Sequence, residues 1–332
     1  MTRRVAGLAA AGTLSLYLAV KVIWVAVALL GDGPPQSDGS TAEWVILNAV
    51  TVVMATTGIA LGMALAQPWG MRLPTAPVLF FSWMGSGFLG SLLPYGVVAA
   101  VLSAAGVRLG NEDDAGADGG SAGGAPAGDG GMPEWETAFI TIGFTGMAVG
   151  LAIALPIYVR ERWPHAFVGR AGAGAPEVPR GRRMLLVPAA TTVLAVMWLF
   201  WVFGGKLGLN TAFHSWDLNG RLLIASGALW ALLGGWSVWV LAGLTGRRLP
   251  LWLPMMTGFV ASGSLFAWNS WRFVWAVLRP GDYEPLEHPA VAVVEHGIGM
   301  GAGIAILSLL IRVYRARAAT HAAIGANRVI AS

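Results

Sequence analysis

Four side chains that can carry charge or exchange a proton fall inside strongly apolar stretches of this sequence: Lys21, Arg272, Glu295 and His296. A charged group near the centre of a bilayer costs at least about 2.5–3.5 kcal/mol on insertion scales, so such groups are rare, are normally paired, and are functional candidates by default. The chemistry that they offer is ion pairing, proton exchange and the binding of a polar group of a substrate.

Helical spacing brings several of these residues together. In AWNSWRFVW (267–275), Trp268, Trp271 and Arg272 share one helix face with Trp275. Arg272 lies about six residues before the end of one apolar stretch, and Glu295 lies about six residues after the start of the next. Both are therefore roughly 9 Å below the same side of the membrane. We expect an Arg272–Glu295 ion pair flanked by indole rings, with Lys21 reaching toward the same carboxylate. The candidate substrate-binding set is Lys21, Arg272, Glu295, His296, Asn269, Trp268 and Trp271. A purely structural ion pair is the alternative.

Several kinds of catalytic and metal chemistry have no motif here. The chain has no cysteine, which excludes disulfides and thiolate sites, and it contains no HExxH and no phosphate loop. We therefore expect no catalytic residue, no metal and no cofactor. Glu295 and His296 are neighbours on a helix and point about 100° apart, so they are poorly placed to act on one atom. An intramembrane enzyme that uses Glu295, His296 and Lys21 on a hydrophobic substrate remains the alternative.

The elements that must position these residues are membrane helices. Of the 332 residues, 56% are hydrophobic and only 11% are charged, with a mean hydropathy of +0.65; a soluble domain carries roughly 25% charged residues. The composition predicts an all-α polytopic integral membrane protein. The segment 95–105 follows the third apolar stretch, 76–93, and is expected to be a kinked or interfacial extension of it. Eight stretches have the roughly 20 apolar residues that a span needs: 9–30, 44–66, 76–93, 135–158, 184–204, 221–244, 251–277 and 290–311.

Basic residues separate by side of the membrane. Fifteen arginines fall in the segments on the side of the N-terminus, and four basic residues fall on the other side. The positive-inside rule then places both termini in the cytoplasm, with the plasma (inner) membrane as location. The pI of 9.8 follows from this distribution, which predicts membrane lipid rather than nucleic acid as a partner. Cleavage of a signal peptide near Ala28 is the alternative for the first stretch.

Similar segments recur in the two halves of the chain. Arg-Leu-Pro at 72–74 returns at 248–250, Ser86-Gly87 returns as Ser262-Gly263, and Gly146-Met147 resembles Gly299-Met300. We predict two parallel four-helix repeats, 1–158 and 184–312, joined by a cytoplasmic linker (159–183) and followed by a basic cytoplasmic tail (313–332). The Gly/Ala-rich acidic loop 109–134 is expected to be disordered.

The second half opens with WLFWVFGGKLGLN (198–210), in which Trp201, Gly204, Gly205 and Gly208 form a pattern. This segment resembles the first helix of a small four-helix bacterial membrane family of unknown function, and the resemblance implies no activity. Glycines also recur at short spacing in the fourth and eighth stretches, where they allow close helix approach. We expect these two helices to pack tightly, against each other across the pseudo-symmetry axis.

The sequence supports three functional hypotheses. The favoured one is a non-enzymatic protein that binds or moves a small or lipid-like molecule at one asymmetric polar site near the outer leaflet, because the intramembrane charges are not duplicated between the repeats. A small hydrophobic ligand is then a partner. The others are the intramembrane enzyme and an accessory or immunity-type membrane protein.

Overall fold

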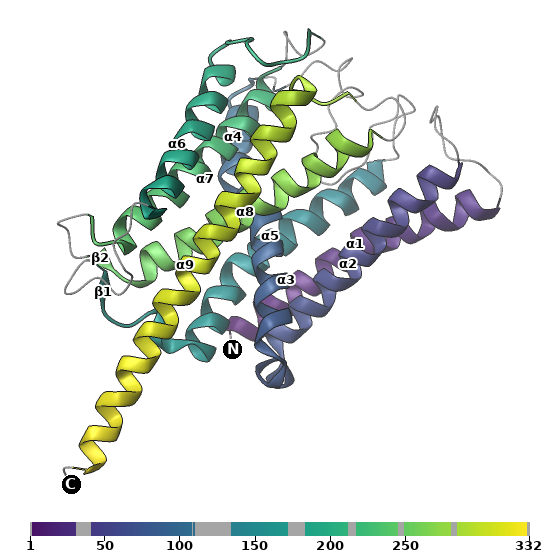
Figure 1. Cartoon of the computed structure of the whole chain (residues 1–332). Helices are drawn as coiled ribbons and strands as arrows, with labels where there is room; N and C mark the ends of the chain where they lie inside the picture. The colour runs from purple at the N-terminus through teal and green to yellow at the C-terminus, as the bar shows by residue number, and fades with distance from the viewer. Residues whose placement is uncertain are drawn as a thin grey trace. The chain divides into compact units, whose positions relative to one another are not determined.

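The chain is all-α and polytopic, as the sequence predicts. The computed structural model describes residues 2–30, 41–107, 109, 134–171, 183–211, 217–244, 249–279 and 284–330 (Figure 1). Most of the loop 109–134 and part of the linker 159–183 lie outside these residues. The expected disorder of this loop therefore stays a prediction. Among the described helices, seven are long and apolar enough to cross a membrane. The protein is therefore a multi-pass membrane protein.

The chain divides into two compact units. The first comprises Met1–Tyr158 with Ser215–Leu223 and Pro280–Asp282. The second comprises Val159–His214, Ile224–Arg279 and Tyr283–Ser332. Each unit has its own packed helices and its own buried polar residues. That the units are parallel repeats stays a prediction.

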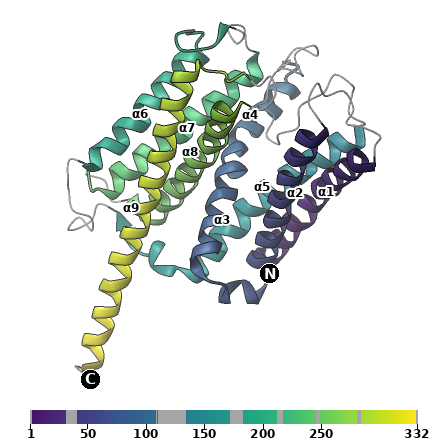
Figure 2. The same ribbon diagram turned by 45° about the vertical axis from the view of Figure 1, so that its right-hand side comes forward.

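The first unit begins with the helical pair α1 (Thr2–Leu30) and α2 (Thr41–Ala66), which lie side by side (Figures 1 and 2). The short η1 (Pro68–Arg72) leads to α3 (Thr75–Phe88). A 3-10 turn, η2 (Gly90–Leu92), then interrupts the helix before α4 (Leu93–Ala104). Pro94 lies in the first turn of α4, where its missing N–H is tolerated. The apolar run 75–104 is thus one broken span, as expected for a kinked extension. Helix α5 (Glu134–Arg162) completes the unit.

The second unit contains four long helices, α6 (Arg183–Val202), α7 (Leu218–Leu241), α8 (Trp252–Leu278) and α9 (Pro289–Ile330). Helix α8 has 27 residues, enough to cross a bilayer, but it is not among the seven most apolar helices. Its tryptophans, serines and Asn269 lower its hydropathy. Ser262, Ser264 and Asn269 are buried in the protein, so α8 does not need an apolar surface at these positions.

Glycines determine which helices approach closely. A Cβ built on Gly150 of α5 would lie 2.5 Å from Cβ of Ala10 on α1, and one on Gly303 of α9 would lie 2.7 Å from the carbonyl oxygen of Ser262 on α8. The predicted tight packing is therefore present, but its partners differ from the expectation. The glycines of α5 meet α1 and those of α9 meet α8, because each helix finds small residues inside its own unit. Gly297 and Gly301 of α9 face open space.

A small clasp lies at the start of the linker. The segment η4 (Pro164–Ala166) precedes β1 (Arg170–Ala171), which pairs antiparallel with β2 (Leu249–Pro250). Arg317 of α9 donates hydrogen bonds to the carbonyl oxygens of Val168 and Arg170, each at 3.1 Å. The clasp ties the C-terminal part of α9 to the chain that precedes α8.

Candidate functional site

A turn after α6 positions Glu287, a carboxylate in the segment between α8 and α9. Gly204 and Gly208 have φ of 95° and 88°, a conformation that residues with a Cβ adopt at a cost. Residues 208–210 then bond to the segment before α9: the amide of Asn210 donates to Leu286 O at 3.0 Å, and that of His288 donates to Gly208 O at 2.8 Å. Glu287 is held between these bonds and is only 1% exposed.

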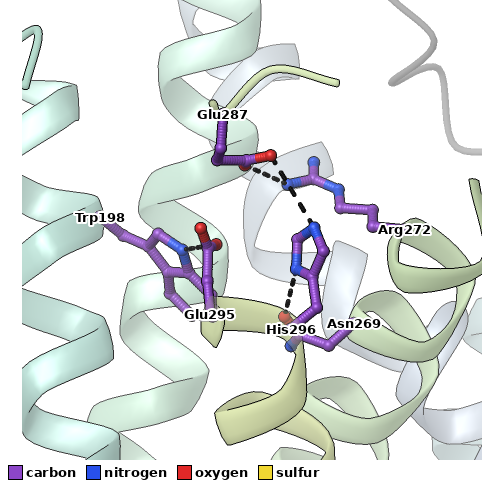
Figure 3. Close-up of polar contacts among 6 residues, drawn as sticks. All are labelled: Trp198, Asn269, Arg272, Glu287, Glu295 and His296. Carbon is purple, nitrogen blue, oxygen red and sulfur yellow. Dashed lines mark hydrogen bonds and ion pairs between the residues drawn. The ribbon is translucent and has the colours of Figure 1, made fainter. Parts of the chain in front are cut away.

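Glu287 lies between a cation and an imidazole. Its Oε1 is 3.9 Å from Nη1 of Arg272 on α8, and its Oε2 is 3.8 Å from Nε2 of His296 on α9 (Figure 3). The other ring nitrogen of His296, Nδ1, is 3.0 Å from Oδ1 of Asn269. Helices α8 and α9 and the segment between them therefore converge on one buried polar group.

Glu295 precedes His296 on α9, and its side chain points toward α6. Its Oε1 accepts a hydrogen bond of 2.5 Å from the indole Nε1 of Trp198 on α6 (Figure 3). Its Oε2 is buried and has no hydrogen-bond partner in the described part of the chain. We call the six residues drawn in Figure 3 the second-unit cluster: Trp198, Asn269, Arg272, Glu287, Glu295 and His296.

The predicted Arg272–Glu295 ion pair is wrong. Arg272 pairs with Glu287 because the bonds to residues 208–210 fold Glu287 inward, and Glu295 is bonded to Trp198 instead. The indole beside Glu295 thus comes from α6 rather than from α8. On α8, Trp268 and Trp271 are partly buried, and the ring of Trp271 packs against that of Trp275 with centroids 5.5 Å apart.

Lys21 has partners in the first unit. The side chain is fully buried, and its Nζ donates to Oδ1 of Asn48 on α2 at 3.1 Å. The ammonium lies 3.9 Å from the ring centroid of Trp24, whose indole N–H donates to Oε2 of Glu136 on α5 at 2.9 Å. The expectation that Lys21 reaches toward Glu295 is therefore wrong: the nearby acceptor is Asn48, and the carboxylate of its cluster is Glu136. The expected single polar site is two clusters, one in each unit.

Burial dominates the electrostatics of Glu287, which lies outside the spanning helices. Removal from water raises the pKa of this carboxyl above its ordinary value, and the Arg272 guanidinium lowers it by less. In the described residues, no group of three histidine, aspartate or glutamate side chains is arranged to hold a metal ion.

Sequence reasoning identified Asn269, Arg272, Glu295 and His296, which the structure brings into one cluster, but it missed Glu287, Trp198 and Glu136. Glu287 follows Pro285 and Leu286, and this apolar context inside an acidic loop is the one sequence feature that hints at burial. No protein-family model, curated protein or solved structure matches the chain. The candidate site is therefore interpreted from its geometry.

Proposed function

We propose that this protein binds or moves a small or lipid-like molecule without chemical change, and that the second-unit cluster is its binding site. The arginine distribution supports a plasma-membrane location with both termini in the cytoplasm. In that orientation, the cluster lies near the outer leaflet, because Glu295 is about six residues, or roughly 9 Å, from the start of α9.

One observation carries the proposal: the buried, unbonded Oε2 of Glu295. Leaving a buried acceptor without a partner costs about 1–3 kcal/mol, and more for a charged group. A ligand that brings an N–H donor or a positive charge compensates for this loss. We infer an amine, or another donor group on an apolar body, as the ligand.

Catalysis by the same residues is disfavoured by their directions. His296 faces Asn269 and Glu287, whereas Glu295 faces Trp198 (Figure 3). An acid/base pair must reach the same reacting atoms, and these two side chains diverge. Binding needs only the unbonded oxygen of Glu295.

Three amphiphiles with equal chain length test the proposal. Octylamine carries a cationic donor, octanol a neutral donor, and octanoate an anionic acceptor. The purified full-length protein in lipid nanodiscs is heated with each, and the Tm is measured. Octylamine is expected to raise the Tm, because a ligand that binds the folded state stabilises it by about 2.7 kcal/mol at 100 times its Kd. Octanoate is expected to have no such effect.

The variants Glu295→Gln and Glu284→Gln complete the test. Glu284 is exposed and lies in the segment that precedes α9, so its variant should keep the octylamine shift, whereas Glu295→Gln should lose it. An equal shift with octanoate, or an undiminished octylamine shift in Glu295→Gln, would contradict ligand binding at this carboxylate. In that case the accessory role through protein contacts gains support.

A further inference from the structure

The hydrogen bonds of Asn269 determine which nitrogen of His296 carries a proton. The Nδ2 of Asn269 is 2.7 Å from the carbonyl oxygen of Leu265, which can only accept, so the amide NH2 must point there. The Oδ1 of Asn269 therefore faces His296 Nδ1 at 3.0 Å. Since an amide oxygen only accepts, Nδ1 carries the hydrogen.

A neutral imidazole with its hydrogen on Nδ1 has a bare lone pair on Nε2. That lone pair faces Oε2 of Glu287 at 3.8 Å, and both groups are buried, at 1% exposure each. Two lone pairs that face each other in a buried site repel. At 3.8 Å the two atoms are beyond hydrogen-bond distance; when they approach to about 3 Å, a single proton between them removes the repulsion, and it can lie on either side.

We propose that Glu287 and His296 share one exchangeable proton and form the proton-binding element of the second-unit cluster. In one state, Oε2 carries the proton and Nε2 is bare. In the other, the proton is on Nε2, which leaves an imidazolium and a carboxylate. The transfer breaks one O–H bond and forms one N–H bond, and the Nδ1–H bond to Asn269 is unchanged.

The charged groups around the pair act on both states. Arg272 on α8 favours the carboxylate of Glu287 and opposes the imidazolium. Glu295 on α9 lies near enough to Glu287 for their charges to interact, and a negative charge there opposes the carboxylate of Glu287. Helix α6 contributes the neutral Trp198. A positively charged ligand at Glu295 cancels that negative charge and so favours the carboxylate, with the proton on His296, which couples ligand and proton. This consequence rests on the proposed function; the shared proton does not.

Nitrogen NMR of the full-length protein in nanodiscs, with ¹⁵N-labelled histidine, tests the shared proton directly. The His296 signals are assigned by their loss in His296→Asn. We expect a protonated Nδ1 and an Nε2 whose shift lies between those of a bare and a protonated nitrogen. In Glu287→Gln, the side-chain amide can donate a hydrogen bond but cannot transfer a proton. The ¹⁵N shift of Nε2 should therefore move to the value of an unprotonated nitrogen. The exposed Glu284→Gln should leave it unchanged.

Arg272→Gln provides a second test if Glu287→Gln fails to fold. Loss of the guanidinium removes both its stabilisation of the Glu287 carboxylate and its opposition to the imidazolium, so the Nε2 shift should differ from that of the wild type. The proposal is overturned if Nε2 is bare in the wild-type protein at every pH, or if the hydrogen resides on Nε2 with Nδ1 bare. Because no ligand is added, these results are independent of the octylamine test: a bare Nε2 together with an octylamine shift leaves binding intact and removes only the proton.

Discussion

Trp198 on α6 donates its indole hydrogen to Glu295 on α9, across the first and last long helices of the second unit. Trp24 on α1 bonds in the same way to Glu136 on α5 in the first unit. An indole has one donor and no acceptor, so each bond satisfies the tryptophan but leaves one carboxylate oxygen for other partners. Each bond joins the first and the last long helix of its own unit.

Removing the indole donor should destabilise the second unit. In Trp198→Phe, neither oxygen of Glu295 has a hydrogen bond from the described residues, which costs about 1–3 kcal/mol. We expect the Tm in nanodiscs to fall by several degrees. Trp239→Phe is the matched control, because Trp239 is 42% exposed on α7. An equal fall in both variants would show that the indole–carboxylate bond contributes nothing beyond the loss of a tryptophan.

Close approach of α8 and α9 depends on particular glycines. Gly303→Leu inserts a side chain where Cβ alone would lie 2.7 Å from a backbone oxygen. Overpacking of this kind typically costs about 1–3 kcal/mol, so the Tm should fall. Gly301→Leu is the control on the same helix, since Gly301 faces open space, and its Tm should be close to wild type. Similar Tm values for the two variants would contradict the close-packing interpretation.

Lys21 and Asn48 should be energetically coupled. Asn48→Leu removes the acceptor of a fully buried ammonium, and leaving a buried charged donor unbonded costs at least about 1–3 kcal/mol. Adding Lys21→Met removes that charge, so the double variant should be more stable than Asn48→Leu alone. Thermal unfolding of the four proteins gives the coupling, expected at about 0.5–3 kcal/mol. Additive effects of the two substitutions would rule out a direct interaction.

The buried carboxyl of Glu287 should make stability depend on pH. Its pKa in the folded protein is raised above the ordinary 4.5, so the folded state binds more protons than the unfolded chain between 4.5 and the raised value. The stabilisation by the protonated group is complete below that window and is lost as pH rises through it. The Tm of the wild type minus that of Glu287→Gln should therefore fall with rising pH.

Glu284→Gln serves as the control for this measurement, because Glu284 is exposed and its replacement should preserve the pH profile of the wild type. If the Tm of the wild type minus that of Glu287→Gln instead grew with rising pH, the ion pair with Arg272 would contribute more to stability than burial of the neutral carboxyl.

Apolar length and charge distribution were enough to predict the membrane class and the positions of the long helices. A run of about 20 apolar residues has few alternatives to a spanning helix, because every backbone group must be hydrogen-bonded within lipid. The same argument identified Asn269, Arg272, Glu295 and His296 as notable residues, since polar groups in such runs must face protein. It did not identify their partners, which depend on how helices rotate about their axes and on where short loops fold.

By itself, the sequence determined that this protein is a helical membrane protein with ionisable groups buried in its spans. Only the tertiary structure decided that Arg272 pairs with Glu287, that Glu295 bonds to Trp198, and that Lys21 bonds to Asn48. The difference is physical. Helix formation in a bilayer is dictated by local composition, whereas an ion pair depends on distances between residues far apart in the chain. Here the hydrogen bonds between residues 208–210, after the glycine turn, and the segment before α9 hold Glu287 beside Arg272.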